Sequence, residues 1–215
     1  VTCTDCHDAH SLKLKFDGNK LCAQCHIPEK YDTPKHHLHQ TNTESSKCIN
    51  CHMPGRFYMG NDFRRDHSFR IPRPDLSVKY GTPNACNGCH DDKSNSWAAN
   101  QVEEWYGPTR VPHFSDQLLR GWISGDLNAL VTLSNDDSTA AIVRGTAINY
   151  LSQADLSLVH SNMSNWMNSK EVLVRKAAQQ AIRDFPKEER LRLAAPAVHD
   201  HNKGVRIEAA MNLVD

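Results

Sequence analysis

Apolar residues are distributed unevenly, and their spacing divides the chain into two unlike parts. Residues 1–95 contain few long apolar runs and much Gly, Pro, Asn, Asp and Lys. Such a segment cannot bury enough apolar surface to form a conventional core. From about residue 126 onward, Ala, Leu and Val recur at the spacing of helices that pack on one another. The pattern therefore predicts short helices, loops and little strand in the first part, and packed helices in the second.

The second part contains a sequence repeat. The segments VRGTAINYL, VRKAAQQAI and VRIEAAMNL begin at Val143, Val174 and Val205, so the period is 31 residues. A small residue and a larger aliphatic residue align in all three segments: Ala147, Ala178 and Ala209, and Leu151, Ile182 and Leu213. Small side chains allow helices to approach closely where they cross. Each segment is predicted to be the inner helix of a two-helix unit, with outer helices at roughly 126–134, 155–167 and 187–199.

These patterns predict a mainly α protein with a HEAT-like α-solenoid at residues 126–215. In such an array each helix pair stacks on the next to bury a shared core, and about three pairs are needed for stability. A non-repeating helical bundle is the alternative. Helices at about 96–106 and 114–124 form a predicted connector, 96–125. Three tryptophans are expected to pack between the two halves: Trp97, Trp105 and Trp122.

One charged position also recurs in the repeat. Arg144, Arg175 and Arg206 each follow the first Val of their segment. A solenoid would place them in a column, with each side chain reaching the turn of its own unit or of the adjacent one. The last unit ends at Val214-Asp215 without an obvious polar cap, so we expect the array to continue or to dock on a partner there.

Composition and charge narrow the classes of function. Lys+Arg and Asp+Glu are both 25, so the chain is neutral and does not resemble a basic nucleic-acid binder. No apolar run approaches the roughly 20 residues of a spanning helix. The sequence opens at Val1 without a charged and apolar leader, so we expect either a leader that has been removed or a piece of a longer chain.

The cysteines carry the strongest chemical signal. All eight lie in residues 1–89, in four pairs with two residues between the members of each pair: Cys3 and Cys6, Cys22 and Cys25, Cys48 and Cys51, and Cys86 and Cys89. A histidine follows the second cysteine of every pair: His7, His26, His52 and His90. C-x-x-C-H is the attachment signature of c-type haem. Two thiols reach the two vinyl groups of the porphyrin, and the next side chain offers its imidazole to the iron.

Three other uses of paired cysteines explain this pattern less well. A zinc ribbon uses C-x-x-C pairs but needs no histidine after each one. A disulfide framework in an exported protein also leaves the four histidines unexplained. A thioredoxin-like site needs a single motif in a βαβ unit. The sequence therefore predicts four covalently attached haems c, which form the core of a tetrahaem module at residues 1–95.

Five further histidines lie among the motifs and are candidates for the sixth position on the irons: His10, His36, His37, His39 and His67. His10 is too close in sequence to its own motif to cross that haem, so it would serve a neighbouring haem. His36 and His39 stand at i and i+3, on one side of a helical turn. Two of the three clustered histidines are expected to be ligands. His67 has Asp66 beside it, a carboxylate that could orient the ring.

Other polar residues are weaker candidates. The remaining histidines are interpreted mainly as surface residues: His113, His160, His199 and His201. Met53 and Met59 could be axial ligands, but packing is the preferred role for Met53. Five arginines in residues 56–73 form either a solvated basic surface or partners for haem propionates: Arg56, Arg64, Arg65, Arg70 and Arg73.

The stretch from Cys3 to Gly107, about half of the chain, resembles a known group of proteins. CTDCHDAHSLKLK, LCAQCH, CINCHMPGRFYMGNDFRRDHSFRIPRPDLS and GTPNACNGCH…SWAANQVEEWYG are similar to the haem module of exported bacterial multihaem c-type cytochromes that carry helical repeats downstream. CHMP and DHSF also resemble the terminal haem region of multihaem nitrite reductases. The resemblance implies bis-His haems that use His10 and His67. The C-x-x-C-K motif of the nitrite reductases is absent here.

The sequence thus predicts an electron-transfer protein rather than an enzyme, located in the periplasm or outside the cell. Its haems would exchange electrons with other redox proteins or neighbouring haem subunits, and the solenoid would serve docking or assembly. Two alternatives stay open. One is a haem reductase or oxidase with one open iron, and the other is a subunit of an extracellular cytochrome filament, a possible homo-polymer.

Overall fold

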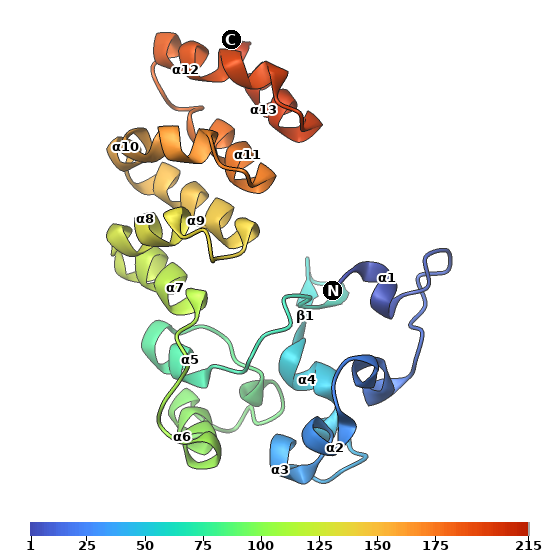
Figure 1. The fold of residues 1–215 in the computed structure, drawn as a ribbon. Helices are drawn as coiled ribbons and strands as arrows, with labels where there is room; N and C mark the ends of the chain where they lie inside the picture. The colour runs from blue at the N-terminus through green and yellow to red at the C-terminus, as the bar shows by residue number, and fades with distance from the viewer. Residues whose placement is uncertain (215) are drawn as a thin grey trace. The chain divides into compact units, whose positions relative to one another are not determined.

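A computed structural model describes residues 1–214, and the chain is mainly helical (Figure 1). The backbone divides into two compact units, Val1–Thr109 and Arg110–Asp215, named the N-terminal unit and the C-terminal unit below. The two helices predicted for the connector are present. The first, α6 (Asn95–Tyr106), lies in the N-terminal unit, and the second, α7 (Phe114–Ser124), lies in the C-terminal unit.

The N-terminal unit consists of short helices, 3₁₀ turns and one hairpin. Strands β1 (Gly55–Tyr58) and β2 (Asp62–Arg65) pair antiparallel. The helical segments before α6 are α1 (Cys3–Cys6), η1 (Gly18–Gln24), α2 (Pro28–Tyr31), α3 (Pro34–His37), η2 (Glu44–Ser46), α4 (Cys48–His52), α5 (Pro74–Tyr80) and η3 (Cys86–Gly88). Proline stands in the first turn of α2, α3 and α5, where its missing N–H costs no hydrogen bond. Little regular structure was predicted here, and the shortness of these elements confirms it.

Apolar burial is sparse in the N-terminal unit. Among its residues, the buried hydrophobic side chains are Leu76, Ala98 and Val102. Large apolar side chains are exposed instead, including Leu12 at 73 % and Met59 at 85 %. A single polypeptide core of this size does not stabilise about a hundred residues. The side chains of this unit therefore leave much of its apolar surface unburied, and a bound apolar group would be needed to bury it.

The C-terminal unit is a succession of helices. After α7 come α8 (Leu127–Asn135), α9 (Ala141–Ala154), α10 (Leu156–Met167), α11 (Val172–Ala181), α12 (Lys187–Ala194), η4 (Ala195–His199) and α13 (Lys203–Leu213). Helix α9 packs on α11, and α11 packs on α13, while α8, α10 and α12 each contact the helix that follows (Figure 1). The third outer helix departs from its predicted bounds. Its α-helical part ends at Ala194 and Pro196 lies in the 3₁₀ turn that follows, because proline has no N–H to continue an α-helix.

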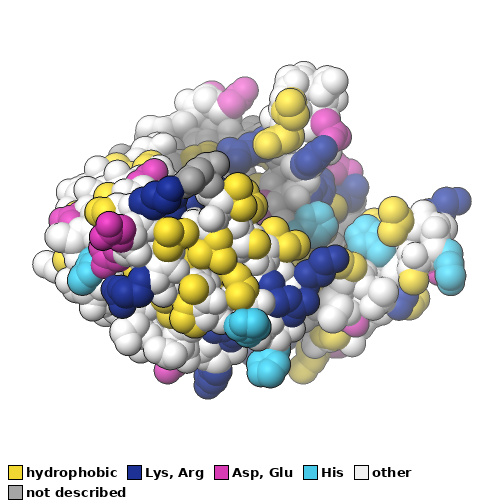
Figure 2. Space-filling view, turned by 90° about the horizontal axis from the view of Figure 1, so that it is seen from above, with side chains coloured by type: hydrophobic (Ala, Val, Ile, Leu, Met, Phe, Trp, Pro, Cys, Tyr) yellow, Lys and Arg dark blue, Asp and Glu magenta, His cyan; other side chains and the backbone are white. Residues whose placement is uncertain are grey.

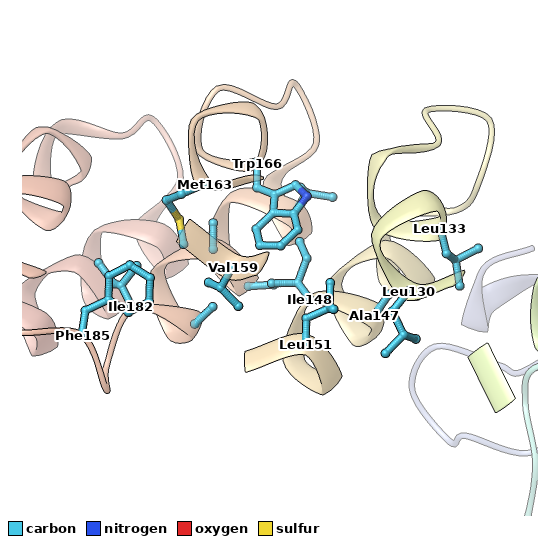
Figure 3. Packing of buried hydrophobic residues seen from close by; sticks show 14 of the residues in the cluster. Leu130, Leu133, Ala147, Ile148, Leu151, Val159, Met163, Trp166, Ile182 and Phe185 are labelled. Carbon is cyan, nitrogen blue, oxygen red and sulfur yellow. The ribbon is translucent and has the colours of Figure 1, made fainter. Parts of the chain in front are cut away.

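The repeated positions of the sequence form the core of the C-terminal unit. Figure 3 shows Leu130, Ile148, Leu151, Trp166 and Ile182 packed along the helices. The three aligned alanines are completely buried: Ala147, Ala178 and Ala209. Leu213, the third aligned aliphatic residue, is 37 % exposed.

The recurring arginines anchor the turns between helices, as predicted. Arg175 donates to the carbonyl of Ser169 at 2.9 Å and, through two nitrogens, to Asp200 of the next unit at 2.7 and 3.0 Å. Arg206 donates to the Asp200 carbonyl at 2.8 Å. Arg144 is 2 % exposed and reaches Ser134 and Asp137. Hydrogen bonds from Arg175 hold the pKa of Asp200 below its usual range.

The far end of the helical array carries exposed apolar side chains. Ile207 and Met211 on α13, and Val214 after it, are 49 %, 55 % and 70 % exposed. Figure 2 views the molecule from the side on which α12 and α13 lie in Figure 1, and hydrophobic side chains gather on that face. This end of the described chain therefore has no polar cap.

Ala178→Leu should destabilise the C-terminal unit, because Ala178 is fully buried on α11, which packs between α9 and α13. Overpacking a core position of this kind typically costs about 1–3 kcal/mol. Helix melting followed by circular dichroism measures the loss. The matched control is Ala210→Leu on α13, where the alanine is exposed. A disturbed haem spectrum with unchanged helix melting would contradict the division into separate units.

Candidate functional site

Every C-x-x-C-H motif folds as a single helical turn. The backbone N–H of the motif histidine donates to the carbonyl of the first cysteine in three of the motifs, at 2.8 Å for His7, 3.0 Å for His26 and 2.9 Å for His90. The third motif is the helix α4 itself. Residues three apart on such a turn lie on the same side, so both thiols of a pair face one direction. This is the arrangement that attachment to one edge of a porphyrin requires.

Backbone carbonyls orient several of the imidazoles. His7 Nδ1 lies 2.7 Å from the Leu12 oxygen, and His52 Nδ1 lies 2.8 Å from the Arg70 oxygen. His39 Nδ1 bonds to the His37 carbonyl in the same way. A carbonyl only accepts, so the proton is on Nδ1 and Nε2 keeps its lone pair. Metal-binding histidines use this arrangement, in which one nitrogen donates to the protein and the other binds the metal.

Two candidate distal histidines each lie near a motif histidine. The ring centroids of His36 and His52 are 6.1 Å apart, and their planes differ by 8°. The centroids of His39 and His90 are 6.3 Å apart, with 31° between the planes. The prediction that His36 and His39 share one side of a helical turn is wrong. Helix α3 ends at His37, and Leu38 is left-handed at φ +55°, which directs the two rings to different motifs.

Aromatic side chains that the sequence did not assign to the site surround these histidines. Tyr31 contacts both His26 and His36 edge-on, at 5.6 and 5.3 Å between centroids. Trp97 lies 4.9 Å from the ring of His90, and Trp105 lies 6.4 Å from that of His39. These two tryptophans were expected between the two halves of the chain. They instead contact candidate ligands, because α6 brings them beside segments far away in the sequence.

His37 differs from its two neighbours in the cluster. Its Nδ1 accepts a hydrogen bond from the backbone N–H of His39 at 3.2 Å, so its proton is on Nε2. That Nε2 is buried and has no hydrogen-bond partner in the described chain. Burial of an unpaired polar atom is costly, and a bound group with a polar atom would satisfy it. A hydrogen-bond acceptor on a bound group would therefore satisfy His37 Nε2.

The other two distal candidates make local contacts. The backbone N–H of His10 donates to Asp8 at 3.2 Å. His67 Nδ1 lies 2.9 Å from the carbonyl oxygen of Arg65, the second residue before it. The expectation that Asp66 orients this ring is therefore wrong. The Asp66 carboxylate instead pairs with Arg70 at 2.6 Å.

Burial and neighbouring groups shift the pKa of one histidine and of several motif thiols. Burial lowers the pKa of His36, and His52 and His37 lower it further, so its imidazole stays neutral and able to bind a metal. A hydrogen bond from the Cys48 thiol lowers the pKa of Cys22 to about 7. The second and third motifs therefore lie beside each other. Burial raises the pKa of Cys51, and Cys86 in the fourth motif raises it further.

The arginines after the third motif mostly bind groups of the protein itself. Arg65 donates to the carbonyls of Ile49 and Met53 at 3.2 and 3.1 Å, and so holds the loop after the motif. Three others pair with nearby carboxylates: Arg64 with Asp62, Arg70 with Asp66 and Arg73 with Asp75. Arg64 and Arg70 are more than 60 % exposed, which agrees with the interpretation as a solvated surface.

Histidines outside the motif region have structural contacts. His113 precedes α7 and accepts a hydrogen bond from the N–H of Ser115. His160 pairs with Glu189 at 2.8 Å. Met59, one of the two methionines considered as axial ligands, is 85 % exposed.

Comparison with known families gives one match. Residues 1–31 match a family described as doubled CXXCH motif, which covers the first two motifs. No curated protein and no solved structure matches the chain. In the described residues, no helix is long and apolar enough to cross a bilayer. The doubled motif indicates a c-type cytochrome-like protein with covalently bound haem, whose general role is electron transfer.

Proposed function

We propose that the chain is a tetrahaem electron carrier with a helical docking domain. The observation that carries the proposal is the presence of four C-x-x-C-H motifs, each folded as a helical turn. The exposed apolar side chains and the sparse core of the N-terminal unit support four bound haems, since porphyrin faces would cover that surface. When bound, haem iron exchanges single electrons.

The chain's own residues hold and insulate the cofactors. Thioethers from the eight motif cysteines fix the haems, and the carbonyls of Leu12 and Arg70 keep Nε2 of His7 and His52 unprotonated and oriented. The thiols of Cys22 and Cys48 contact each other, so the edges of the second and third haems would be close. Short separations of this kind suit electron transfer along the module.

The C-terminal unit is proposed as a HEAT-like solenoid for docking or assembly. Its inner helices α9, α11 and α13 pack on one another in chain order. The recurring arginines donate hydrogen bonds to backbone carbonyls in the turns before these helices. Solenoids present extended surfaces to partners. Here the partners would be other redox proteins or further haem subunits, including copies of the same chain in a filament. Covalent haem attachment fits an exported protein in the periplasm or outside the cell.

One observation favours an enzyme as the second candidate. In the third and fourth motifs, the ring of a second histidine lies 6.1 and 6.3 Å from the ring of the motif histidine, between centroids. At the second motif, the ring nearest to His26 among the described contacts is that of Tyr31. An iron that lacks a second imidazole would have an open position, as a haem reductase or oxidase needs. In the electron-carrier proposal, His10 and His67 supply the remaining ligands.

Mass and spectrum together test the proposed function. The purified protein should carry four haems that remain attached after acid–acetone extraction, measured by denaturing mass spectrometry. Its oxidised spectrum should be low-spin for all four irons, because each is closed by two imidazoles. A polypeptide without haem would contradict the cytochrome proposal. Four haems with one high-spin iron would favour the reductase or oxidase instead.

A further inference from the structure

We propose that His36 is the sixth ligand of the haem attached at Cys48 and Cys51, and that His39 is the sixth ligand of the haem attached at Cys86 and Cys89. The inference rests on the proposed function and adds which histidine serves which haem. The short segment from His36 to His39 would then join two haems, and His37 would not bind iron.

The spacing of the rings carries the proposal. A metal–imidazole nitrogen bond is about 2.0–2.1 Å, and the ring centroid lies about 1.1 Å behind that nitrogen, so two imidazoles across one metal have centroids roughly 6.3 Å apart. The pair His36 and His52 is at 6.1 Å, and the pair His39 and His90 is at 6.3 Å. Both separations match the value that one iron between two imidazole nitrogens requires.

Hydrogen bonding separates the three clustered histidines. His39 donates from Nδ1 to the His37 carbonyl and keeps Nε2 free for iron. His37 accepts at Nδ1 and carries its proton on Nε2, the opposite tautomer. Its Nε2–H suits a hydrogen bond to an acceptor on a bound group better than a bond to a metal.

Backbone conformation explains how adjacent residues serve two haems. Leu38 has φ +55°, a left-handed conformation that is unfavourable for an L-residue with a side chain. Such strain is kept where the surroundings demand it, often at functional sites. Without this turn, α3 would continue and place His36 and His39 on one face. Tyr106 further fixes the segment by donating its hydroxyl proton to the His36 carbonyl, and Trp105 contacts the His39 ring.

The first test counts open irons in the full, haem-loaded chain. His36→Ala and His39→Ala should each convert one of the four irons to high-spin, measured by electron paramagnetic resonance, and each should bind one carbon monoxide per chain after reduction. The double variant should bind two. Lys35→Ala changes an exposed residue in the same helix and should open none. A His36 or His39 variant that gains no open iron, or a double variant that gains only one, would overturn the proposal.

The second test identifies which iron opens. In a chain with Cys48→Ala and Cys51→Ala, which lacks the third haem, His36→Ala should add no open iron while His39→Ala still adds one. Replacing Cys86 and Cys89 should reverse this pattern. The pairing would be overturned if each histidine variant gave the same number of open irons in both cysteine variants. It would also be overturned if His36→Ala opened an iron only where the third haem is missing.

Two further readouts keep the result interpretable. If the cysteine variants fold poorly, His36→Met and His39→Met in the full chain should each change one iron to His/Met ligation, visible as a shift in one reduction potential out of four. Two shifted potentials, or none, would contradict the assignment of one iron to each histidine. Haem count by mass separates a failure of the proposed function from a failure of the ligand pairing. Loss of all haem would contradict the proposed function. Four haems with other ligands would contradict the pairing alone.

Discussion

A chain produced without its haems should lose the N-terminal unit and keep the C-terminal unit folded. The physical reason is the distribution of buried apolar side chains. The N-terminal unit buries Leu76, Ala98 and Val102, whereas the C-terminal unit contains one continuous cluster that runs from Leu130 to Ala194. Without porphyrins, the exposed apolar residues of the N-terminal unit have nothing to pack against. The conformational entropy lost when its loops become ordered is then not offset by apolar burial.

Limited proteolysis measures this outcome. The haem-free chain should be cleaved within residues 1–109 roughly tenfold or more faster than the haem-loaded chain, because cleavage follows the population of open states. A resistant fragment that begins near Arg110 should remain, and circular dichroism should show it to be helical. The haem-loaded chain under the same conditions is the control. Equal protection of residues 1–109 in both forms would contradict a haem-built core.

Trp166→Ala should be the most destabilising single change in the C-terminal unit. Trp166 on α10 is completely buried, and its indole N–H donates to Asn135 at 3.0 Å. Removing a large buried aromatic side chain costs typically about 3–5 kcal/mol, because the lost contacts leave a cavity. Asn135 would keep its hydrogen bond from Asn165, so the loss comes mainly from packing.

Urea unfolding monitored by circular dichroism at the helix band measures the free-energy difference, with haem absorbance as a separate probe of the N-terminal unit. Trp122→Ala is the matched control, since Trp122 is 49 % exposed and stacks on Tyr150. An aromatic pair of this kind adds about 0.5–1.5 kcal/mol beyond its buried area. A loss for Trp166→Ala no larger than that for Trp122→Ala would contradict the packing in Figure 3.

Local sequence patterns were sufficient to predict the secondary structure of the C-terminal unit. The 31-residue period identified the segments that form α9, α11 and α13, and it gave two of the three outer helices within a residue of their observed bounds. Helix formation depends on neighbours three and four positions apart, so the signal is contained in short windows. The shortened α12 shows the limit of this reasoning, since Pro196 changed the helix type where the period predicted continuity.

The sequence by itself determined which residues can attach haem, because a C-x-x-C-H motif brings its thiols and imidazole together within one helical turn. Only the tertiary structure decided which other groups meet them. The ring of His36 lies near that of His52, and the ring of His39 lies near that of His90, 51 residues away in the sequence. The left-handed Leu38 separates the two histidines. The sequence did not decide which two of the three clustered histidines bind iron, and it placed His36 and His39 on one helical face. Contacts between distant segments depend on how the whole unit packs, and no local spacing encodes them.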